Sequence, residues 1–306
     1  MALLTNAGES YTLSAGQGVG LHNLEDVSNF ITNISPTEVP FYSKIGRTKA
    51  KAVTHEFLTH SLAAANAANV VVEGNEASFI TPTVIVRLQN STQINQKSVA
   101  VSGTQDAVMK AGMGKEIAYR VILHGKEIKR DIEAALLNNT QQITGDTTTA
   151  RRLKGVAGFV TTNTTTITTA LTAADINAEL QDAWEDGGNP DVMFVNGTTK
   201  RLVSALAGST ATSYQFNHDA EKKRFTTSVD IWDGDFGVQR IIPDRFDTTL
   251  TIKCLEMNHW KLAQLRPMAV KTLGDTGDSS KRMLTCEVTL ESRAENANAI
   301  LTHAGS

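Results

Sequence analysis

Apolar residues recur at helical spacing between residues 103 and 139, which predicts a long helix with one apolar face. On its polar side, Glu116 with Arg120 and Lys129 with Glu133 have the i,i+4 spacing of ion pairs. Such a helix is more typical of an architectural element than of a catalytic one. The apolar stripe consists of Met113, Ile117, Val121, Ile128, Ile132 and Leu136. Glycine is a weak helix former, which indicates a bend or an irregular start at Gly112, Gly114 or Gly125.

Strand-like alternation precedes this helix and predicts a long hairpin over residues 51–98. Its rising limb covers residues 53–57, and its tip is rich in Ala and Asn. The returning limb contains Val84, Val86, Leu88, Thr92 and Ile94. A two-stranded ribbon is marginally stable on its own in water, and the chain offers no obvious segment to cover it. We therefore expect the hairpin to lie against another molecule.

The first twenty residues are polar and small, without periodicity, and have the character of an arm. A short helix is predicted next, before Ser35 and Pro36, from the helical spacing of Leu24, Val27, Phe30 and Ile31. Pro40 is expected to force an extended path towards Phe41 and Tyr42.

A Thr-rich stretch at residues 161–170 leads into a compact α/β pattern. Thr172 and Asp175 have the spacing of a capping box, which predicts a helix start there. The apolar face of that helix is expected to hold Ile176, Leu180, Ala183 and Trp184. The segment "VMFVN" predicts a buried strand, and a second helix follows it, capped by Thr198 or Thr199 and containing Leu202, Val203 and Leu206.

Strand patterns dominate the remainder of the chain. The residues from Asp233 to Phe236 are a hairpin signal between two apolar segments, and strands are expected at 249–255 and 259–265. The last strand is expected to alternate, with one face made of Leu284, Cys286, Val288 and Leu290.

Composition places the chain among ordinary globular proteins. It has 306 residues, 41% of them hydrophobic and 20% charged, and a net charge of −3 that argues against a surface devoted entirely to nucleic acid. The N-terminus lacks the basic and apolar regions of a signal peptide, and no run of 18 apolar residues is present. Cys254 and Cys286 are expected to be buried free thiols rather than a disulfide, which fits synthesis in a reducing cytoplasm.

Known catalytic motifs do not fit this sequence. His55 and His60 flank Glu56 at i,i+5 rather than the i,i+4 spacing of a zinc hydrolase helix. "VNGTTK" lacks the P-loop pattern, "DIWDGDFG" lacks the calcium-loop spacing, and "KSVAVSG" supplies no nucleophile elbow. Glu73 and Glu76 lie in the hairpin tip, a poor place for preorganised acid–base chemistry. We assign no catalytic, cofactor-binding or metal-binding residue.

Two basic clusters remain. One consists of Lys44, Arg47, Lys49 and Lys51, and the other of Arg151, Arg152 and Lys154. Either could contact phosphate, because salt-dependent backbone contacts require only Lys and Arg. Solvated faces or ion pairs between subunits are favoured, because aromatic residues are not interleaved with them.

Four segments together resemble the major capsid proteins of tailed bacteriophages. They are "NISPTEVPFYSKIG", "KSVAVSGTQDAV", "GKEIKRDIEAALL", and "RPMAV" followed by "TGDSSKR". The resemblance covers about residues 24–295 and is weaker in the Thr-rich stretch and in the hairpin tip. It implies the α+β fold that encapsulins and the herpesvirus capsid floor also share.

The resemblance implies five parts. Residues 1–45 would be an N-terminal arm with a short helix, and 46–100 the extended loop, with its crossing part at 52–97. Residues 101–154 would form a peripheral domain with the spine helix, 155–270 an α/β axial domain, and 271–306 the return strand to the peripheral domain and the C-terminus. Many relatives carry a removable scaffolding segment before these motifs, and the 25 residues that precede them here are expected to leave no room for one.

The implied function is structural: self-assembly into an icosahedral head that encloses double-stranded DNA. The extended loop would lie across a neighbouring subunit, with contacts expected from His55, Phe57, Leu62, Val70, Val72, Glu73, Glu76, Phe79 and Arg87. Implied partners are hexamers and pentamers of the same chain, a portal, scaffolding or decoration proteins, and packaged DNA held without sequence specificity. The basic clusters would face DNA or a neighbouring subunit. The location would be the virion, after assembly in the host cytoplasm.

Two alternatives stay open. An encapsulin-like compartment has the same architecture but packages protein cargo. A cytoplasmic α/β enzyme would use residues 191–200 as a ligand site.

Overall fold

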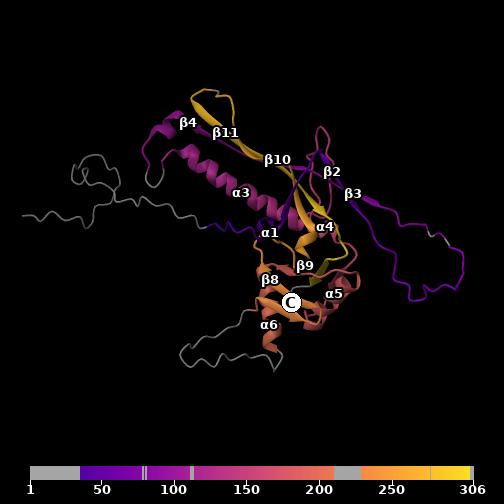
Figure 1. Cartoon of the computed structure of the whole chain (residues 1–306). Coiled ribbons are helices and arrows are strands. Elements are labelled where there is room, and N and C mark those ends of the chain that lie inside the picture. Colours follow the sequence, from indigo (N-terminus) through magenta and orange to yellow (C-terminus); the bar gives the residue numbers. More distant parts are fainter. Residues whose placement is uncertain are drawn as a thin grey trace, which may run out of the picture.

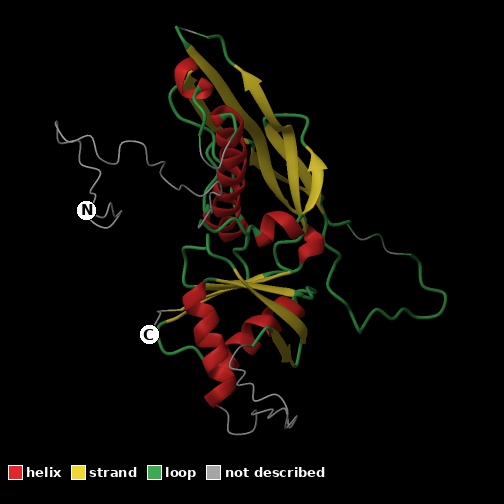
Figure 2. Ribbon diagram, turned by 90° about the vertical axis from the view of Figure 1, so that its left-hand side faces the viewer, coloured by secondary structure: helices red, strands yellow, loops and turns green. Residues whose placement is uncertain are grey.

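The computed structural model describes residues 35–77, 79, 81–110, 114–209, 229–275 and 277–303, with backbone only at 207–209. Figure 1 and Figure 2 show an elongated molecule with two sheets, one above the other, and a long loop that projects to one side. Helices and strands are mixed in both halves, in agreement with the α+β class expected from the sequence.

The upper half is a four-stranded sheet with one long helix along it (Figure 2). The helix is α3 (Glu116–Asn138), preceded by the short α2 (Gly103–Ala107). The fully buried Ile128, Ile132 and Leu136 of α3 share one apolar core with the sheet. The strand order is β1 (Gly46–Lys49), β10 (Trp260–Thr272), β11 (Ser279–Ser292) and β4 (Gln93–Ser102).

The single helix predicted over 103–139 is wrong in its extent, because the chain leaves helical geometry between α2 and α3. Gly112 and Met113 fall outside the described residues, and Gly125 lies within α3 without interrupting it. The pair of Glu116 with Arg120 is confirmed, at 3.0 Å. The predicted pairing of Lys129 with Glu133 is wrong: Glu133 is fully buried and binds backbone N–H groups of the arm.

The lower half is a six-stranded sheet with two helices on one face. These helices are α5 (Ala173–Glu185) and α6 (Gly197–Ser209). The strand order is β5 (Thr164–Ile167), β12 (Ala299–His303), β9 (Thr251–Leu255), β6 (Val192–Val195), β8 (Gly237–Pro243) and β7 (Ile231–Gly234). The hairpin predicted around residues 233–236 is the β7–β8 connection, and the predicted buried strand is β6.

Alternate residues of β6 face different cores, which is why all four are buried. Met193 and Val195 pack with the α5 and α6 side, whereas Val192 and Phe194 join the core that contains α3. The six-stranded sheet is therefore the layer between its own helices and the upper half of the molecule.

The start and the end of α5 are formed by the residues that the sequence indicates. The Thr172 hydroxyl accepts from the Asp175 N–H, and the Asp175 carboxylate accepts from the Thr172 N–H, so the capping box is confirmed. Gly187 has a φ of +85° just after the helix, the left-handed conformation that favours glycine. Trp184 was expected on the buried face, but it is 57% exposed and lies beside Phe236.

The arm enters the core through α1 (Pro40–Lys44). The extended path predicted after Pro40 is wrong, because proline occupies the first helical turn, where its missing N–H costs nothing. Phe41 is fully buried between the two halves, with ring centroids 5.4 Å from Phe194 and 6.4 Å from Trp260. The helix predicted from Leu24 to Ile31 lies outside the described residues.

The boundaries of the two sheets differ from the predicted parts. Residues 260–270, placed in the α/β lobe, belong to β10 of the four-stranded sheet. Residues 299–303, placed in the return segment, form β12 inside the six-stranded sheet. Residues 46–49 and 93–100, placed in the extended loop, are β1 and part of β4. The chain crosses between the halves more often than its local patterns indicate.

Candidate assembly surfaces

The extended loop is a short ribbon with a long unpaired excursion. β2 (Thr54–Thr59) and β3 (Val86–Ser91) pair along six residues, and the described residues between them form no strand. The predicted limbs were too long, because Val84 precedes β3 and Ile94 already belongs to β4. Figure 1 shows the excursion reaching well beyond the body of the molecule.

The base of this loop is fixed to its own chain. Phe57 is buried with its ring centroid 6.1 Å from that of Phe159, and His55 Nε2 lies 3.2 Å from a Glu291 carboxylate oxygen. Asn90 is fully buried, and its side-chain amide donates to the carbonyl oxygens of Leu290 and Lys154 at 2.8 and 2.9 Å. The expectation that the hairpin has no intramolecular partner is therefore wrong at its base. Two of the nine residues predicted to contact a neighbouring subunit, His55 and Phe57, lie in this base and contact their own chain instead.

The outer part of the loop, unlike its base, is exposed to solvent. Glu73 and Glu76 are exposed there, and Arg87 makes a partly exposed ion pair of 3.4 Å with Glu56. Large apolar side chains point into solvent at Leu62 (88% exposed), Val70 (82%), Val72 (80%) and Phe79 (98%). So many exposed apolar groups on one excursion are typical of a surface that another molecule covers.

The first basic cluster is open to solvent. Lys44, Lys49 and Lys51 are exposed, and the Arg47 guanidinium lies 4.8 Å from the centre of the Tyr42 ring. That ring is buried, so it cannot stack on a base. This cluster keeps three lysines available for a phosphate or a carboxylate.

The second basic cluster is largely used inside the chain. Arg151 forms a 2.7 Å ion pair with Glu287, and the Lys154 ammonium lies 4.9 Å from the centre of the Phe159 ring. Only Arg152 among the three is exposed. The sequence missed this because Glu287 lies more than 130 residues away on β11.

From Cys286 to Ser292 both faces of β11 are buried, although the sequence alternates. Burial alone would raise the pKa of Glu287, but hydrogen bonds from Thr92 and Arg266 and the charges of Arg151 and Arg266 hold it below its usual value. The Glu287 carboxylate therefore joins the loop base, the segment before α4 (Val156–Phe159) and the sheet. Its negative charge is offset by the arginines that bind it.

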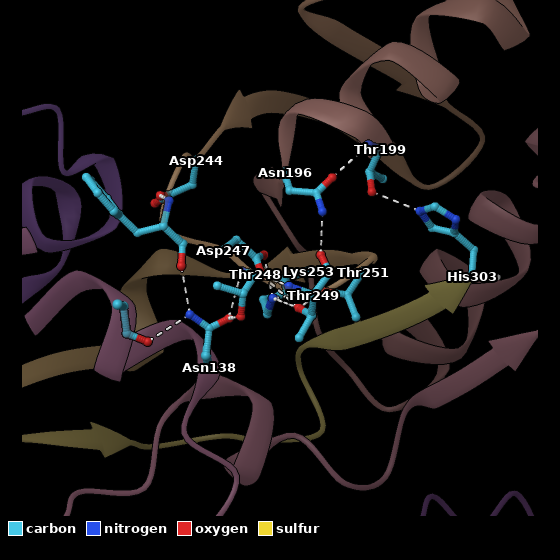
Figure 3. Close-up of polar contacts among 12 residues, drawn as sticks. Asn138, Asn196, Thr199, Asp244, Asp247, Thr248, Thr249, Thr251, Lys253 and His303 are labelled. Carbon is cyan, nitrogen blue, oxygen red and sulfur yellow. Dashed lines mark hydrogen bonds and ion pairs between the residues drawn. The ribbon is translucent and has the colours of Figure 1, made fainter. Parts of the chain in front are cut away.

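A second polar network joins α3 to the six-stranded sheet (Figure 3). The Asn138 amide donates to the Phe246 carbonyl oxygen at 2.8 Å, and its oxygen accepts from the Thr248 N–H at 3.2 Å. Lys253 is fully buried and forms a 2.5 Å ion pair with Asp247. Burial lowers the pKa of Lys253, and the charge of Asp247 opposes that shift.

Residues 191–200, the candidate ligand site of an enzyme, have structural roles in the same region (Figure 3). The Asn196 oxygen accepts from the Thr199 N–H at 2.7 Å, so Asn196 caps α6 rather than Thr198 or Thr199. The Asn196 amide donates to the Thr249 carbonyl oxygen, and the fully buried Thr199 hydroxyl lies 2.8 Å from His303 Nε2. These polar groups already have partners.

Cys254 and Cys286 are buried free thiols, as expected, and burial raises the pKa of Cys286 to about 11. Within the described ranges, no group of three or more His, Cys, Asp or Glu residues is placed to hold a metal ion. The helices of the described segments include none that is long and apolar enough to span a membrane. His55 and His60 bind different groups, Glu291 and Thr83.

The chain matches known proteins both in sequence and in fold. A family model described as SU10 major capsid protein matches residues 5–305. The chain belongs to the SU10 major capsid protein family. The major capsid protein of Escherichia phage Phieco32 is 27% identical over 326 residues, covering 90% of this chain and 92% of that protein.

Solved structures agree on the fold. The capsid asymmetric unit of cyanophage A-1(L) superposes with a TM-score of 0.72 at 10% identity, covering 92% of this chain and 96% of that one. Microbacterium phage Oxtober96 gives 0.66 at 13% identity, covering 92% and 96%. The holo-SrpI encapsulin complex of Synechococcus elongatus gives 0.59 at 11% identity, covering 92% of both chains. At such identities the likeness shows the fold alone.

Membership in the SU10 major capsid protein family confirms the resemblance seen in the sequence. The protein has the fold that phage capsids share with encapsulins, and its function is that of a structural capsid protein of a phage head. The family and the fold imply a non-enzymatic role and a location in the capsid of the virion.

Proposed function

We propose that this chain assembles into hexamers and pentamers of an icosahedral head through its extended loop. The observation that carries the proposal is the contrast between the buried base of the loop and its exposed apolar outer part. Within the described ranges no segment covers the outer part, and the neighbouring copy in a shell is the molecule always present to do so. On this proposal the four-stranded half is the peripheral domain and the six-stranded half is the axial domain.

Removing the outer loop tests this proposal. Deletion of residues 60–82 keeps β2, β3 and the buried contacts of Phe57 and Asn90, so the subunit is expected to fold. Closed shells are expected to disappear in electron micrographs. Regular shells of wild-type size from the deleted chain would show that the loop is not the assembly element.

A milder variant separates a lost surface from a lost loop. Replacing Val70, Val71 and Val72 by Ser keeps the chain length and removes only apolar area. Ile122→Ser on α3, at a position 61% exposed, is the matched control. The loop variant is expected to lose shell yield, and the control is expected to assemble as wild type.

We also propose that the shell encloses double-stranded DNA without sequence specificity. The exposed Lys44, Lys49, Lys51 and Arg152 are the candidates for phosphate contact or for contact with a neighbour. Assembly in the host cytoplasm, a portal, and scaffolding or decoration proteins complete the proposal. The nucleic acid content of purified particles distinguishes the two proposals: abundant DNA is expected here, and particles with little DNA would favour the encapsulin-like alternative.

A further inference from the structure

The arm is held by a carboxylate that the sequence placed on the solvent side of α3. Glu133 is fully buried, and its two oxygens accept the N–H groups of Phe41 and Tyr42 at 2.7 and 2.6 Å. These are N–H groups of the first turn of α1, which lack partners within that short helix. Glu133 therefore fixes the position at which the arm enters the core.

A second carboxyl group meets Glu133 from the other half of the molecule. Asp244 follows β8 and is 1% exposed, and the segment that it begins packs on α3, where the Asn138 amide donates to the Phe246 carbonyl oxygen at 2.8 Å. The Asp244 side chain raises the pKa of Glu133 through a hydrogen bond and through its charge. Its Oδ1 accepts from the Phe246 N–H at 2.8 Å, whereas its buried Oδ2 has no donor within reach among the described residues. Two carboxyl groups in contact have only acceptors unless a proton lies between them.

One cation interacts electrostatically with Asp244, whose charge opposes the lowering of the Lys253 pKa by burial. Lys253 on β9 is the cation of the adjacent network, but its ammonium is bound by Asp247, Thr249 and Thr251. Arg130, one turn before Glu133 on α3, lies over the Phe246 ring at 5.2 Å. Neither Glu133 nor Asp244 forms an ion pair within the described part of the chain.

We infer that Glu133 and Asp244 share one proton, and that this proton joins the arm, α3 and the six-stranded half, so that the junction loosens as the pH rises. Like charges at this separation and this depth cannot both ionise without a large cost. The contact includes α1, because the Glu133 oxygens accept the N–H groups of Phe41 and Tyr42, so α1 is the segment in which we expect to detect the loosening.

The direction of the pH effect follows from linkage. Burial, then the hydrogen bond and charge of Asp244, raise the pKa of Glu133 from 4.5 to about 9, against the opposing effect of the Tyr42 and Phe41 N–H groups. Between these two values the folded chain holds a proton that the unfolded chain has released. The contribution of this pair to stability is therefore full below about pH 4.5 and is lost as the pH rises towards about 9. The inference concerns one subunit and does not depend on shell formation.

Hydrogen exchange of the wild-type subunit is the first test. After correction for the intrinsic rate, opening of the segment containing Phe41 and Tyr42 is expected to rise with pH between 7 and 9. One linked proton corresponds to an increase of up to about tenfold per pH unit. Ordinary carboxyl groups have finished titrating in that range. Opening that is independent of pH in the wild type would overturn the inference without any variant.

Asp244→Asn is the second test. An amide at this position donates to the Glu133 carboxylate without a shared proton, and its oxygen still accepts from the Phe246 N–H. The pH slope of the arm segment is expected to decrease in this variant, because the hydrogen bond and charge of Asp244 no longer raise the pKa of Glu133, whereas burial still does. Asp131→Asn, an exposed carboxyl on α3 that pairs with Lys97, is the control and is expected to keep the wild-type slope. An Asp244→Asn subunit with the full slope would assign the proton to another group.

Whether shells form is a separate readout. If the deletion of residues 60–82 leaves shells intact while the arm still opens with pH, the proposed role of the loop fails and the shared proton stands. If shells depend on the loop but the arm is insensitive to pH, the reverse holds.

Discussion

The base and the outer part of the extended loop contain similar apolar residues in opposite environments. Phe57 is buried against Phe159, whereas Phe79 is 98% exposed. The base is closed by groups from β11 and from the segment before α4, and the outer part is closed by nothing in the described chain. Apolar character alone therefore does not distinguish a residue buried within the subunit from one that we propose to serve assembly. The partner available to the side chain makes the difference.

The largest effect is expected at the base. Phe57→Ala removes a buried aromatic side chain and is expected to destabilise the subunit by about 3–5 kcal/mol. Denaturant unfolding of the unassembled subunit measures this. Phe79→Ala is the matched change on the outer part, and it is expected to alter subunit stability by less than about 0.5 kcal/mol. Equal destabilisation by Phe57→Ala and Phe79→Ala would show that the base and the outer part of the loop do not differ in their contribution to subunit stability.

The next effect tests the polar side of the base. Asn90→Ala deletes hydrogen bonds to the carbonyl oxygens of Leu290 and Lys154 and the acceptor for the Lys154 N–H. A loss of about 2–3 kcal/mol is expected, because Asn90 is fully buried and its partners are buried or partly buried. Gln89→Ala on the neighbouring exposed position of β3 is the control, with little expected change.

A smaller effect on the subunit, but a visible one on the shell, is expected on the outer part. Phe79→Ser leaves the thermal midpoint of the free subunit unchanged and lowers the yield of particles in sedimentation. Recovery of normal yield in the Phe79→Leu variant would show that apolar area is what the neighbour recognises. Normal yield from Phe79→Ser itself would place the contact elsewhere on the loop.

The smallest effect is an expected absence of covalent linkage. Some capsids of this fold join a loop lysine to a neighbouring asparagine, but residues 52–96 contain no lysine. The loop then has no amine nucleophile at its crossing point. Mature particles boiled in detergent and reducing agent are expected to give a single band near 32.9 kDa. A ladder of multimers would mean that a lysine from another segment reaches the neighbour.

Local signals in the sequence were sufficient where the partner lies nearby. The helical stripe predicted Ile128, Ile132 and Leu136 as core, and the capping box predicted the start of α5. The family motifs predicted the fold and the structural role. These features depend on spacing within one element, which a sequence displays directly.

Features that depend on distant partners were missed. Glu133 looked like a solvent-facing partner of Lys129, but α1, about ninety residues earlier, covers it. Glu287 is buried because Thr92, Arg151 and Arg266 converge on it from three segments. The loop base was read as unpartnered because Asn90 and Phe57 meet groups far along the chain. Helical and strand periodicity contains no information about such convergence.

The position of β12 has a consequence for how the molecule is made. Residues 299–303 lie between β5 and β9, so they form an interior strand of the six-stranded sheet rather than an edge. The sheet cannot close until these residues have left the ribosome, although its other strands were synthesised long before. A nascent chain therefore lacks a finished lower half, because β5 has no strand partner and one edge of β9 stays open until β12 is present. Completion of this sheet sets the earliest moment at which a subunit is ready to join another.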